Sequence, residues 1–157
     1  MILGAHTCIR TAEPDDAAFL RRFYPPAPAC GALLDPRREP LMVTEDELRE
    51  LLGRRDMPHV AFYTIEDREG VVRGLCTLRG LNPEARFGEL GVLLLDAADF
   101  GGPLAEEVLC FLCERGFVRR QYNKMLAHCL DAETALRSFL ASRGFVSEGV
   151  QRDVLYT

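Results

Sequence analysis

The chain has 157 residues, of which 48% are hydrophobic and 27% are charged, and its formal net charge is -5 at pH 7. This length predicts a single domain over residues 1–157, with enough apolar residues for a hydrophobic core. The acidic balance argues against nucleic acid as a partner, because domains that bind nucleic acid carry a basic face.

Targeting signals and metal sites are not expected. Residues 1–6 lack the basic and apolar regions of a signal peptide, and no apolar run approaches the roughly 20 residues of a membrane span. Six cysteines without a secretion signal predict reduced thiols, most of them in the core, in a cytoplasmic protein that does not bind membranes. Cys110 and Cys113 match a C-x-x-C pattern, but they fall inside a predicted helix and the three histidines show no ligand spacing.

The first third of the chain predicts one strand and two helices. A strand is expected over His6–Arg10, followed by a helix over Pro14–Phe23 whose first acidic residues suit the positive end of the helix dipole. Five of the nine prolines fall in Tyr24–Pro40, which predicts an irregular segment that could line a substrate cleft. The capping box Thr44-Glu45-Asp46-Glu47 begins a second helix, which ends near Leu52.

The middle third predicts an antiparallel meander. Its strands are expected over Val60–Ile65, Val71–Leu78 and Phe87–Leu95, because these runs are rich in β-branched and aromatic residues. A hairpin turn at Asp67–Gly70 separates the first two, and Asn82-Pro83 marks the turn before the third.

The last third predicts helices that alternate with strands. A helix over Pro103–Phe117 precedes a strand over Lys124–Leu130, and a second helix ends at Ser142 before a final strand. Together these elements predict an α+β fold with a single mixed, mostly antiparallel central sheet flanked by helices.

The end of the chain carries a family resemblance. Residues 144–152 read Gly-Phe-x-x-Glu-Gly-x-x-Arg, and with the elements before them they resemble the GNAT superfamily of N-acetyltransferases. The closest likeness is the branch of ribosomal-protein N-terminal acetyltransferases, and Cys8–Asp16 also resembles the family's opening. The resemblance implies the acyl-CoA N-acyltransferase fold and acetyl-CoA as co-substrate. It also implies direct transfer of an acetyl group to a primary amine of a small molecule or peptide, and a possible homodimer.

The resemblance places the pyrophosphate of acetyl-CoA at the beginning of the helix over Pro103–Phe117, where relatives carry Arg/Gln-x-x-Gly-x-Gly/Ala. Backbone N–H groups at a helix N-terminus bind anions. One register puts Phe100 at the basic position, Pro103 at the central glycine and Ala105 at the last small residue. The register without a gap shifts each position by one, so that Asp99 takes the basic position. Either register implies a degenerate loop, and the expected contacts are Phe100, Gly101, Gly102, Leu104 and Ala105. The same residues also fit a Gly-Gly-Pro turn that only begins a helix.

The resemblance also names candidate catalytic residues. Glu89 matches the family's Glu-x-Gly and is the candidate general base, acting through water, although it also fits an ordinary strand glutamate that faces solvent. His128 could relay a proton or be structural, and Cys129 faces the other side of its strand. The main chain of Leu93, Leu94 and Leu95 is expected to contact the pantetheine arm and the acetyl group.

Three positions depart from the family. Glu133 and Leu136 stand where this branch has Asn and Ser, and Leu140 stands where many relatives have a tyrosine proton donor. If the protein is an enzyme, water is expected to protonate the leaving sulfur. The alternative is a non-catalytic GNAT-fold module that binds another ligand or regulates a partner.

Overall fold

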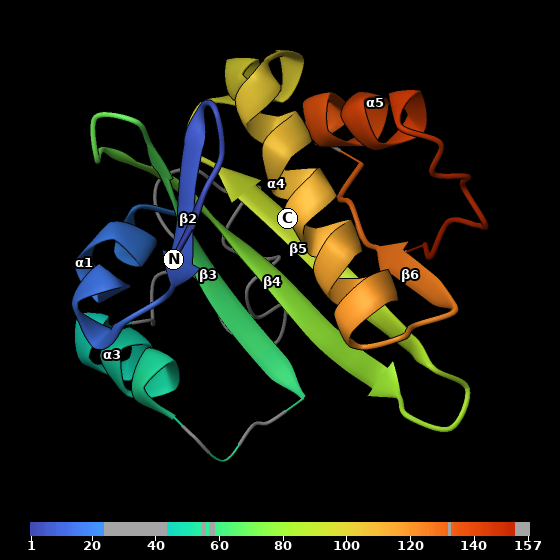
Figure 1. Ribbon diagram of the computed structural model, residues 1–157, viewed down its shortest axis with the longest axis horizontal. Helices are drawn as coiled ribbons and strands as arrows, with labels where there is room; N and C mark the ends of the chain where they lie inside the picture. Colours follow the sequence, from blue (N-terminus) through green and yellow to red (C-terminus); the bar gives the residue numbers. More distant parts are fainter. Residues whose placement is uncertain (24–43, 55, 57–58, 132, 153–157) are drawn as a thin grey trace.

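The computed structural model describes residues 1–23, 44–54, 56, 59–131 and 133–152. These residues form one six-stranded sheet, with the strands side by side in chain order and four α-helices around it (Figure 1). Neighbouring strands are antiparallel except for the last pair, which is parallel. The predicted α+β fold with a single mixed, mostly antiparallel sheet is confirmed. The strands are β1 (Ile2–Leu3), β2 (Thr7–Thr11), β3 (Val60–Asp67), β4 (Val72–Asn82), β5 (Phe87–Leu94) and β6 (Lys124–Ala127).

The N-terminal helix is shorter than predicted. The segment expected as one helix over Pro14–Phe23 consists of a 3-10 turn, the four-residue helix α1 (Ala17–Leu20) and a second 3-10 turn. The first turn is tight because the Asp16 carboxylate accepts a hydrogen bond from the Glu13 amide at 2.8 Å. The predicted cleft segment Tyr24–Pro40 lies outside the described residues.

Helix α3 (Glu45–Gly53) begins with the predicted capping box. The Thr44 hydroxyl accepts a hydrogen bond from the Glu47 amide at 3.2 Å, and the Thr44 amide donates to the Glu47 carboxylate at 2.9 Å. These two bonds satisfy backbone N–H groups that have no partner inside the helix. The sequence prediction of this helix is confirmed.

The meander and its turns are also confirmed, although β4 is longer than expected. Asp67 accepts hydrogen bonds from the amides of Glu69 and Val71, and Gly70 adopts a positive φ of 81° in the same turn. Asn82 closes the next turn by accepting from the Ala85 amide at 2.7 Å. Both turns therefore use the short polar side chains from which they were predicted.

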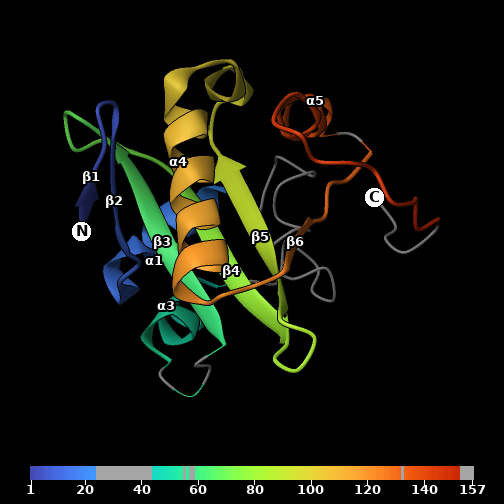
Figure 2. The same cartoon turned by 45° about the vertical axis from the view of Figure 1, so that its right-hand side comes forward.

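Helices α4 (Pro103–Cys113) and α5 (Thr134–Ser142) cover one face of the sheet (Figures 1 and 2). The apolar residues of α4 recur at helical spacing and pack with one side of β4 and β5. The other face packs against α1 and α3 through a second cluster that includes Leu75 and Leu93. Because side chains alternate along a strand, each central strand contributes to both clusters. The predicted helix to Phe117 ends instead in a π-helix over Glu114–Arg119.

The predicted final strand is not present among the described residues. After α5, residues 145–152 form no strand and are held near the sheet by an ion pair between Lys124 and Glu148 at 2.6 Å. Strand β6 also ends earlier than expected, at Ala127 rather than Leu130. Within the described part of the chain, β6 is therefore an edge strand.

The described cysteines differ in their burial. Cys8 and Cys76 are buried as predicted, but Cys110 is exposed on α4, and the cysteines that the structure describes are free thiols. None of the helices formed by the described residues has the length and apolar content that a membrane span needs. In the same residues, no three His, Cys, Asp or Glu side chains come together as a possible metal site.

Asp16 joins α1 to the first strands of the sheet. Its side chain, only 8% exposed, forms a bidentate pair with Arg10 of β2 at 2.8 Å and accepts from the Thr64 hydroxyl of β3 at 2.8 Å. Burial alone would raise the pKa of Asp16, but the hydrogen bonds from Arg10, the Glu13 amide and Thr64 together lower it below its ordinary value. The ionised carboxylate is thus part of the native packing.

Replacing Asp16 is expected to destabilise the fold. Asp16→Asn removes the bidentate ion pair with Arg10, which then keeps only Glu66 as a carboxylate partner, and should lower the free energy of unfolding by about 2 to 3 kcal/mol, measured by urea denaturation at pH 7. Because the folded pKa lies below the reference value of 3.8, this contribution is complete above that pH and is lost as the pH falls through the folded pKa. Asp46→Asn, at an exposed ion pair, is the control and should change stability by less than about 1 kcal/mol. Equal effects of the two substitutions would contradict the role of Asp16.

Candidate active site

Strands β5 and β6 pair over only part of β5. The parallel ladder joins Phe87–Leu90 to Lys124–Ala127 and then stops, while β5 continues to Leu94 paired with β4 alone. The Leu95 amide donates to the Arg73 carbonyl on the β4 side at 3.0 Å. Because main-chain groups of a strand point alternately to its two sides, the N–H groups of Val92 and Leu94 face the gap beside β6. The gap therefore presents main-chain donors.

This geometry divides the predicted main-chain contacts. Leu94 faces the gap, whereas Leu93 and Leu95 direct their main-chain groups towards β4. The Leu95 amide is already hydrogen-bonded within the sheet and is not available to a ligand. Val92, which sequence reasoning did not select, takes the second position on the gap.

Glu89 lies where the two strands begin to part. One of its carboxylate oxygens is 2.8 Å from Nδ1 of His128, and the other accepts hydrogen bonds from the guanidinium of Arg79, including one from Nε at 3.0 Å. Arg79 is the neighbour of Glu89 on β4, and Leu126 is its neighbour on β6, so His128, two residues on, lies on the same face. The structure thus brings together both predicted catalytic residues and adds Arg79.

The hydrogen bond fixes the chemistry of the histidine ring. Since the Glu89 carboxylate is also held by Arg79, it is the acceptor, and Nδ1 of His128 carries the proton. Nε2 of a neutral ring then has a free lone pair. The His128 side chain is 56% exposed, whereas Glu89 is only 18% exposed. The pair therefore presents the histidine, not the glutamate, to an incoming molecule.

Next to this pair, the same face of the sheet carries a row of partly buried cross-strand neighbours. Phe62, Thr77 and Gly91 are cross-strand neighbours one step further along β3, β4 and β5. A Cβ atom on Gly91 would lie 2.6 Å from the Thr77 hydroxyl, so glycine at this position lets the Thr77 side chain lie over β5. Phe62 packs against the cluster formed with α1 and α3. A small ligand here would meet an apolar ring, a hydroxyl and the imidazole.

The opposite face at this end of the sheet is filled by Tyr122. A Cβ atom on Gly88 would lie 2.4 Å from Cε2 of Tyr122 and 2.8 Å from the Arg79 carbonyl oxygen, and one on Gly80 would lie 2.8 Å from the Tyr122 hydroxyl. The two glycines are cross-strand neighbours, so together they form the flat surface on which the ring lies. This packing holds β4 and β5 in the register that pairs Arg79 with Glu89.

The beginning of α4 follows directly from the carboxyl end of β5. Residues 97–101 form a 3-10 helix, Gly102 is the N-cap of α4, and Pro103 occupies its first turn. The Gly102 amide donates to the Asp99 carbonyl at 3.2 Å and Pro103 has no N–H. The amides of Leu104 and Ala105 are therefore the first-turn donors left for an anion. The Ala105 side chain itself is fully buried.

Asp99 does not stand at this helix end as an isolated charge. Both of its carboxylate oxygens accept hydrogen bonds at 3.0 Å from Arg73 of β4. Arg73 was not singled out in the sequence, because it lies 26 residues away and only the fold brings it to the loop. The pair reduces the repulsion that Asp99 alone would exert on a phosphate.

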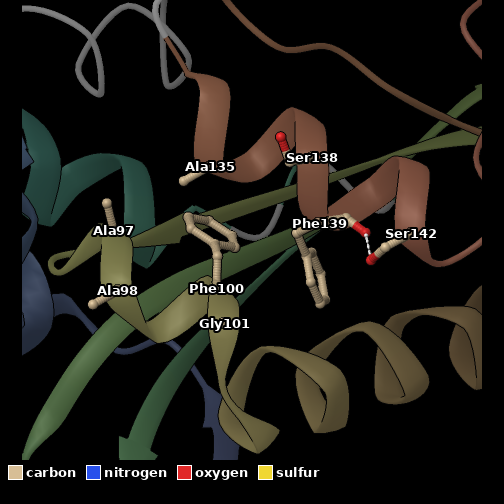
Figure 3. Close-up of a pocket in the computed structure, with 8 residues that line it drawn as sticks. All are labelled: Ala97, Ala98, Phe100, Gly101, Ala135, Ser138, Phe139 and Ser142. Carbon is tan, nitrogen blue, oxygen red and sulfur yellow. Dashed lines mark hydrogen bonds between the residues drawn. The ribbon is translucent and has the colours of Figure 1, made fainter.

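A surface pocket of about 440 Å³ lies between this loop and α5 (Figure 3). Phe100 and Gly101, two of the predicted cofactor contacts, line it on one side. The rings of Phe100 and Phe139 meet with centroids 5.8 Å apart and form its apolar base. The remaining lining residues, which sequence reasoning missed, are Ala97, Ala98, Ala135, Ser138 and Ser142. Their small side chains carry no sequence signal beyond helical spacing.

The positions that depart from the family are structural. Leu136 and Leu140 are buried in the core, so neither contacts solvent or a ligand. Glu133 accepts a hydrogen bond from the Leu130 amide at 2.8 Å, and burial raises the pKa of its carboxyl. Burial also raises the pKa of the Cys129 thiol, which opposes its ionisation to a nucleophilic thiolate.

These features suit a long ligand with an anionic end. The pocket and the amides of Leu104 and Ala105 lie on the α4 and α5 face, and the part of β5 without a β6 partner lies between them and Glu89 in the chain. The fit to acetyl-CoA is partial, because the basic groups near the pocket are already paired. Those ion pairs are Arg73–Asp99, Arg137–Asp131 and Arg143–Glu106.

Comparison with known proteins gives a structural likeness alone. No protein-family model matches the chain, and no curated protein matches its sequence. Solved structures of spermidine N-acetyltransferase from Vibrio cholerae match it closely in shape. The complex of that enzyme with CoA and spermine has a TM-score of 0.74 at 20% identity and covers 93% of this chain and 84% of its own. A dodecameric form has a TM-score of 0.68 at 18% identity, covering 93% and 82%. The complex with manganese ions has a TM-score of 0.69 at 18% identity, covering 92% and 81%.

This likeness shows that the chain has the GNAT fold, the acyl-CoA N-acyltransferase fold that its sequence predicted. The expected likeness to the ribosomal-protein branch stays a prediction.

The contact between Tyr122 and the two glycines is expected to limit substitution at Gly88. Gly88→Ala places a methyl group against the Arg79 carbonyl oxygen and should lower the free energy of unfolding by about 1 to 3 kcal/mol. Gly101→Ala is the control, because a Cβ there meets no atom within 4 Å. Urea denaturation measures both. If Gly88→Ala were as stable as the wild type, Tyr122 would not hold the register of β4 and β5.

Proposed function

We propose that the protein is an acetyl-CoA-dependent N-acetyltransferase that acts on a primary amine. The observation that carries this proposal is the hydrogen-bonded pair of Glu89 and His128 at the point where β5 and β6 part. The pair lies at the end of a gap that begins beside the pocket of α4 and α5. The GNAT fold, and the CoA and spermine bound by the neighbour from Vibrio cholerae, support the same assignment.

In this proposal His128 is the general base and Glu89 orients it. An amine must lose a proton as it attacks, and Nε2 of His128 is the exposed acceptor of the pair. The Glu89 carboxylate fixes the tautomer and stabilises the positive charge that develops on the ring, the role of the acid in catalytic triads. This differs from the role of Glu89 as a base through water that the sequence suggested, because both of its oxygens already have partners.

The remaining groups would act on the transferred acetyl group. Acetyl-CoA would supply this group as a thioester. A bond between the amine nitrogen and the carbonyl carbon forms as the carbon–sulfur bond breaks, and the amine proton passes to His128. The amides of Val92 and Leu94 face the gap and suit the carbonyl oxygen. Because Leu140 is buried, water would protonate the leaving thiolate.

The phosphate end of acetyl-CoA would be held mainly by main-chain groups. The amides of Leu104 and Ala105 at the beginning of α4 are the donors, and Arg73 compensates the charge of Asp99. Phe100 and Gly101 would contact the ligand from the pocket, with Gly102 at the helix cap. Since no free basic side chain of the described residues lies at this loop in place of the family's Arg or Gln, we keep the proposal of a degenerate loop that binds acetyl-CoA weakly.

The second candidate function is a non-catalytic module with the same fold. The observation that favours it is the pairing of Arg73, Arg137 and Arg143 with carboxylates around the pocket.

The dodecamer of the neighbouring enzyme supports a further proposal, that this chain also assembles with copies of itself, as in the homodimer suggested by its sequence.

Acetyl-CoA is expected to raise the melting temperature. A concentration of 100 times the dissociation constant adds about 2.7 kcal/mol to the free energy of unfolding, which corresponds to several degrees for a chain of this size. Ser138→Trp should fill the pocket between the 3-10 helix and α5 and abolish the rise, while Val118→Trp, at an exposed residue on the π-helix, should not. No shift at millimolar acetyl-CoA would favour the non-catalytic module.

Substitutions at the pair separate the two possible bases. If His128 is the base, His128→Gln should lower kcat by about 100-fold or more, and Glu89→Gln should lower it less, by roughly 10- to 100-fold. Both should leave the stabilisation by acetyl-CoA unchanged, since the pair lies outside the pocket. Glu114→Gln, at an exposed ion pair on the π-helix, is the matched control. If His128→Gln kept full activity, His128 would not be the general base, and Glu89 would be the remaining candidate.

A further inference from the structure

Arg79 presents a cation beside the proposed base. Its guanidinium donates through Nε and Nη2 to one oxygen of Glu89, and its side chain remains 50% exposed. Nη1 has no hydrogen-bond partner among the described residues. An arginine held edge-on by one carboxylate keeps donors that can bind a second one.

In the part of the chain that the structure describes, the ion-paired carboxylates on the face of Arg79 do not provide a site for a polycation. On this face of the sheet, Glu89 is bound by Arg79, Glu66 by Arg10 at 2.8 Å, and Glu148 by Lys124 at 2.6 Å. Each of these three carboxylates therefore already has a cationic partner. Recognition of an ammonium chain by ion pairs needs carboxylates that lack a cationic partner.

Resting on the amine acetylation proposed above, we infer that Arg79 is a specificity-determining residue that selects acceptor amines carrying a carboxylate. The reacting nitrogen lies at Nε2 of His128, and the carboxylate of the acceptor binds the outward N–H groups of Arg79. The two side chains contact opposite oxygens of one carboxylate, so the acceptor needs only a few bonds between its amine and its acid.

The rest of the face suits such a molecule. The Thr77 hydroxyl, which lies over Gly91, can bond to a polar group of the acceptor. Val60 and Phe62, the β3 neighbours of Arg79 and Thr77, offer apolar contact to its carbon chain. Free amino acids have this combination of amine, short chain and carboxylate, whereas spermine, which the neighbouring enzyme binds, has no acid.

Binding without acetyl-CoA tests the inference independently of catalysis. Glycine, β-alanine and 4-aminobutyrate, each against its amide, are titrated into the protein while the ring signals of His128 are followed by NMR. The chain has three histidines, so His128→Gln assigns the signal. We expect the best acid to bind about 10- to 100-fold more tightly than its amide, and this ratio to fall close to one in Arg79→Gln.

Two variants serve as controls. Arg86→Gln removes an exposed arginine of the β4–β5 turn, whose partner is Asn123, and should leave the ratio unchanged. Arg79→Lys keeps the charge but loses the planar fork, and should retain part of the preference. A ratio of one in the wild type, a ratio that persists in Arg79→Gln, or tighter binding of spermidine than of every acid would each overturn the inference.

Steady-state acetylation separates this inference from the proposed function. With acetyl-CoA present, kcat/KM should also be about 10- to 100-fold higher for the best acid than for its amide. Arg79→Gln should lower kcat/KM for the acid more than kcat/KM for the amide. If the acids bind through Arg79 but no acceptor is acetylated and acetyl-CoA does not stabilise the protein, the acetyltransferase proposal fails and the anion site stands. If amines are acetylated without preference for the acids, the specificity inference fails and the acetyltransferase proposal stands.

Discussion

One extra residue in β4 determines the geometry of the candidate site. The bulge lies between Gly80 and Asn82, where Leu81 has no partner on β5. It shifts by one residue the register of all β4–β5 pairs on the side of the bulge away from the turn. Because of this shift Arg79, rather than Gly80, lies opposite Glu89. Gly80 and Gly88 then lie opposite each other under Tyr122. The ion pair on one face and the aromatic packing on the other thus depend on the same register.

The sheet separates the two halves of the proposed reaction. Alternation along β5 sends the side chain of Glu89 to the face of α1 and α3, and those of Leu90 and Val92 to the face of α4 and α5. The pocket beside α5 and the pair of Glu89 and His128 therefore lie on opposite faces. They communicate only where β5 and β6 part, which is where a thioester carbonyl and an amine would have to meet.

Compensation of charge recurs around both parts of the site. Arg73 neutralises Asp99 beside the proposed phosphate position, and Arg79 neutralises Glu89 beside the proposed base. The pairing of Arg73 with Asp99 reduces the repulsion between this loop and an anion, but it leaves Arg73 without a free charge to bind the anion. The second pairing places a cation where an acceptor would approach. The same kind of ion pair thus weakens one recognition site and creates another.

The sequence alone determined the order of the elements from β2 to α5, both hairpin turns, the capping box of Thr44 and the membership of Glu89 in the central strand. These depend on local patterns of apolar residues and short polar side chains, which act within a few positions. Only the tertiary structure decided the partners of Glu89, the compensation of Asp99 and the absence of a strand at residues 145–152. Counting back from the turn at Asn82 would have set Glu89 against Gly80, because the alternation of side chains along a strand does not fix the position of a bulge. Contacts between residues far apart in the chain depend on such register shifts and on packing, so local patterns cannot predict them.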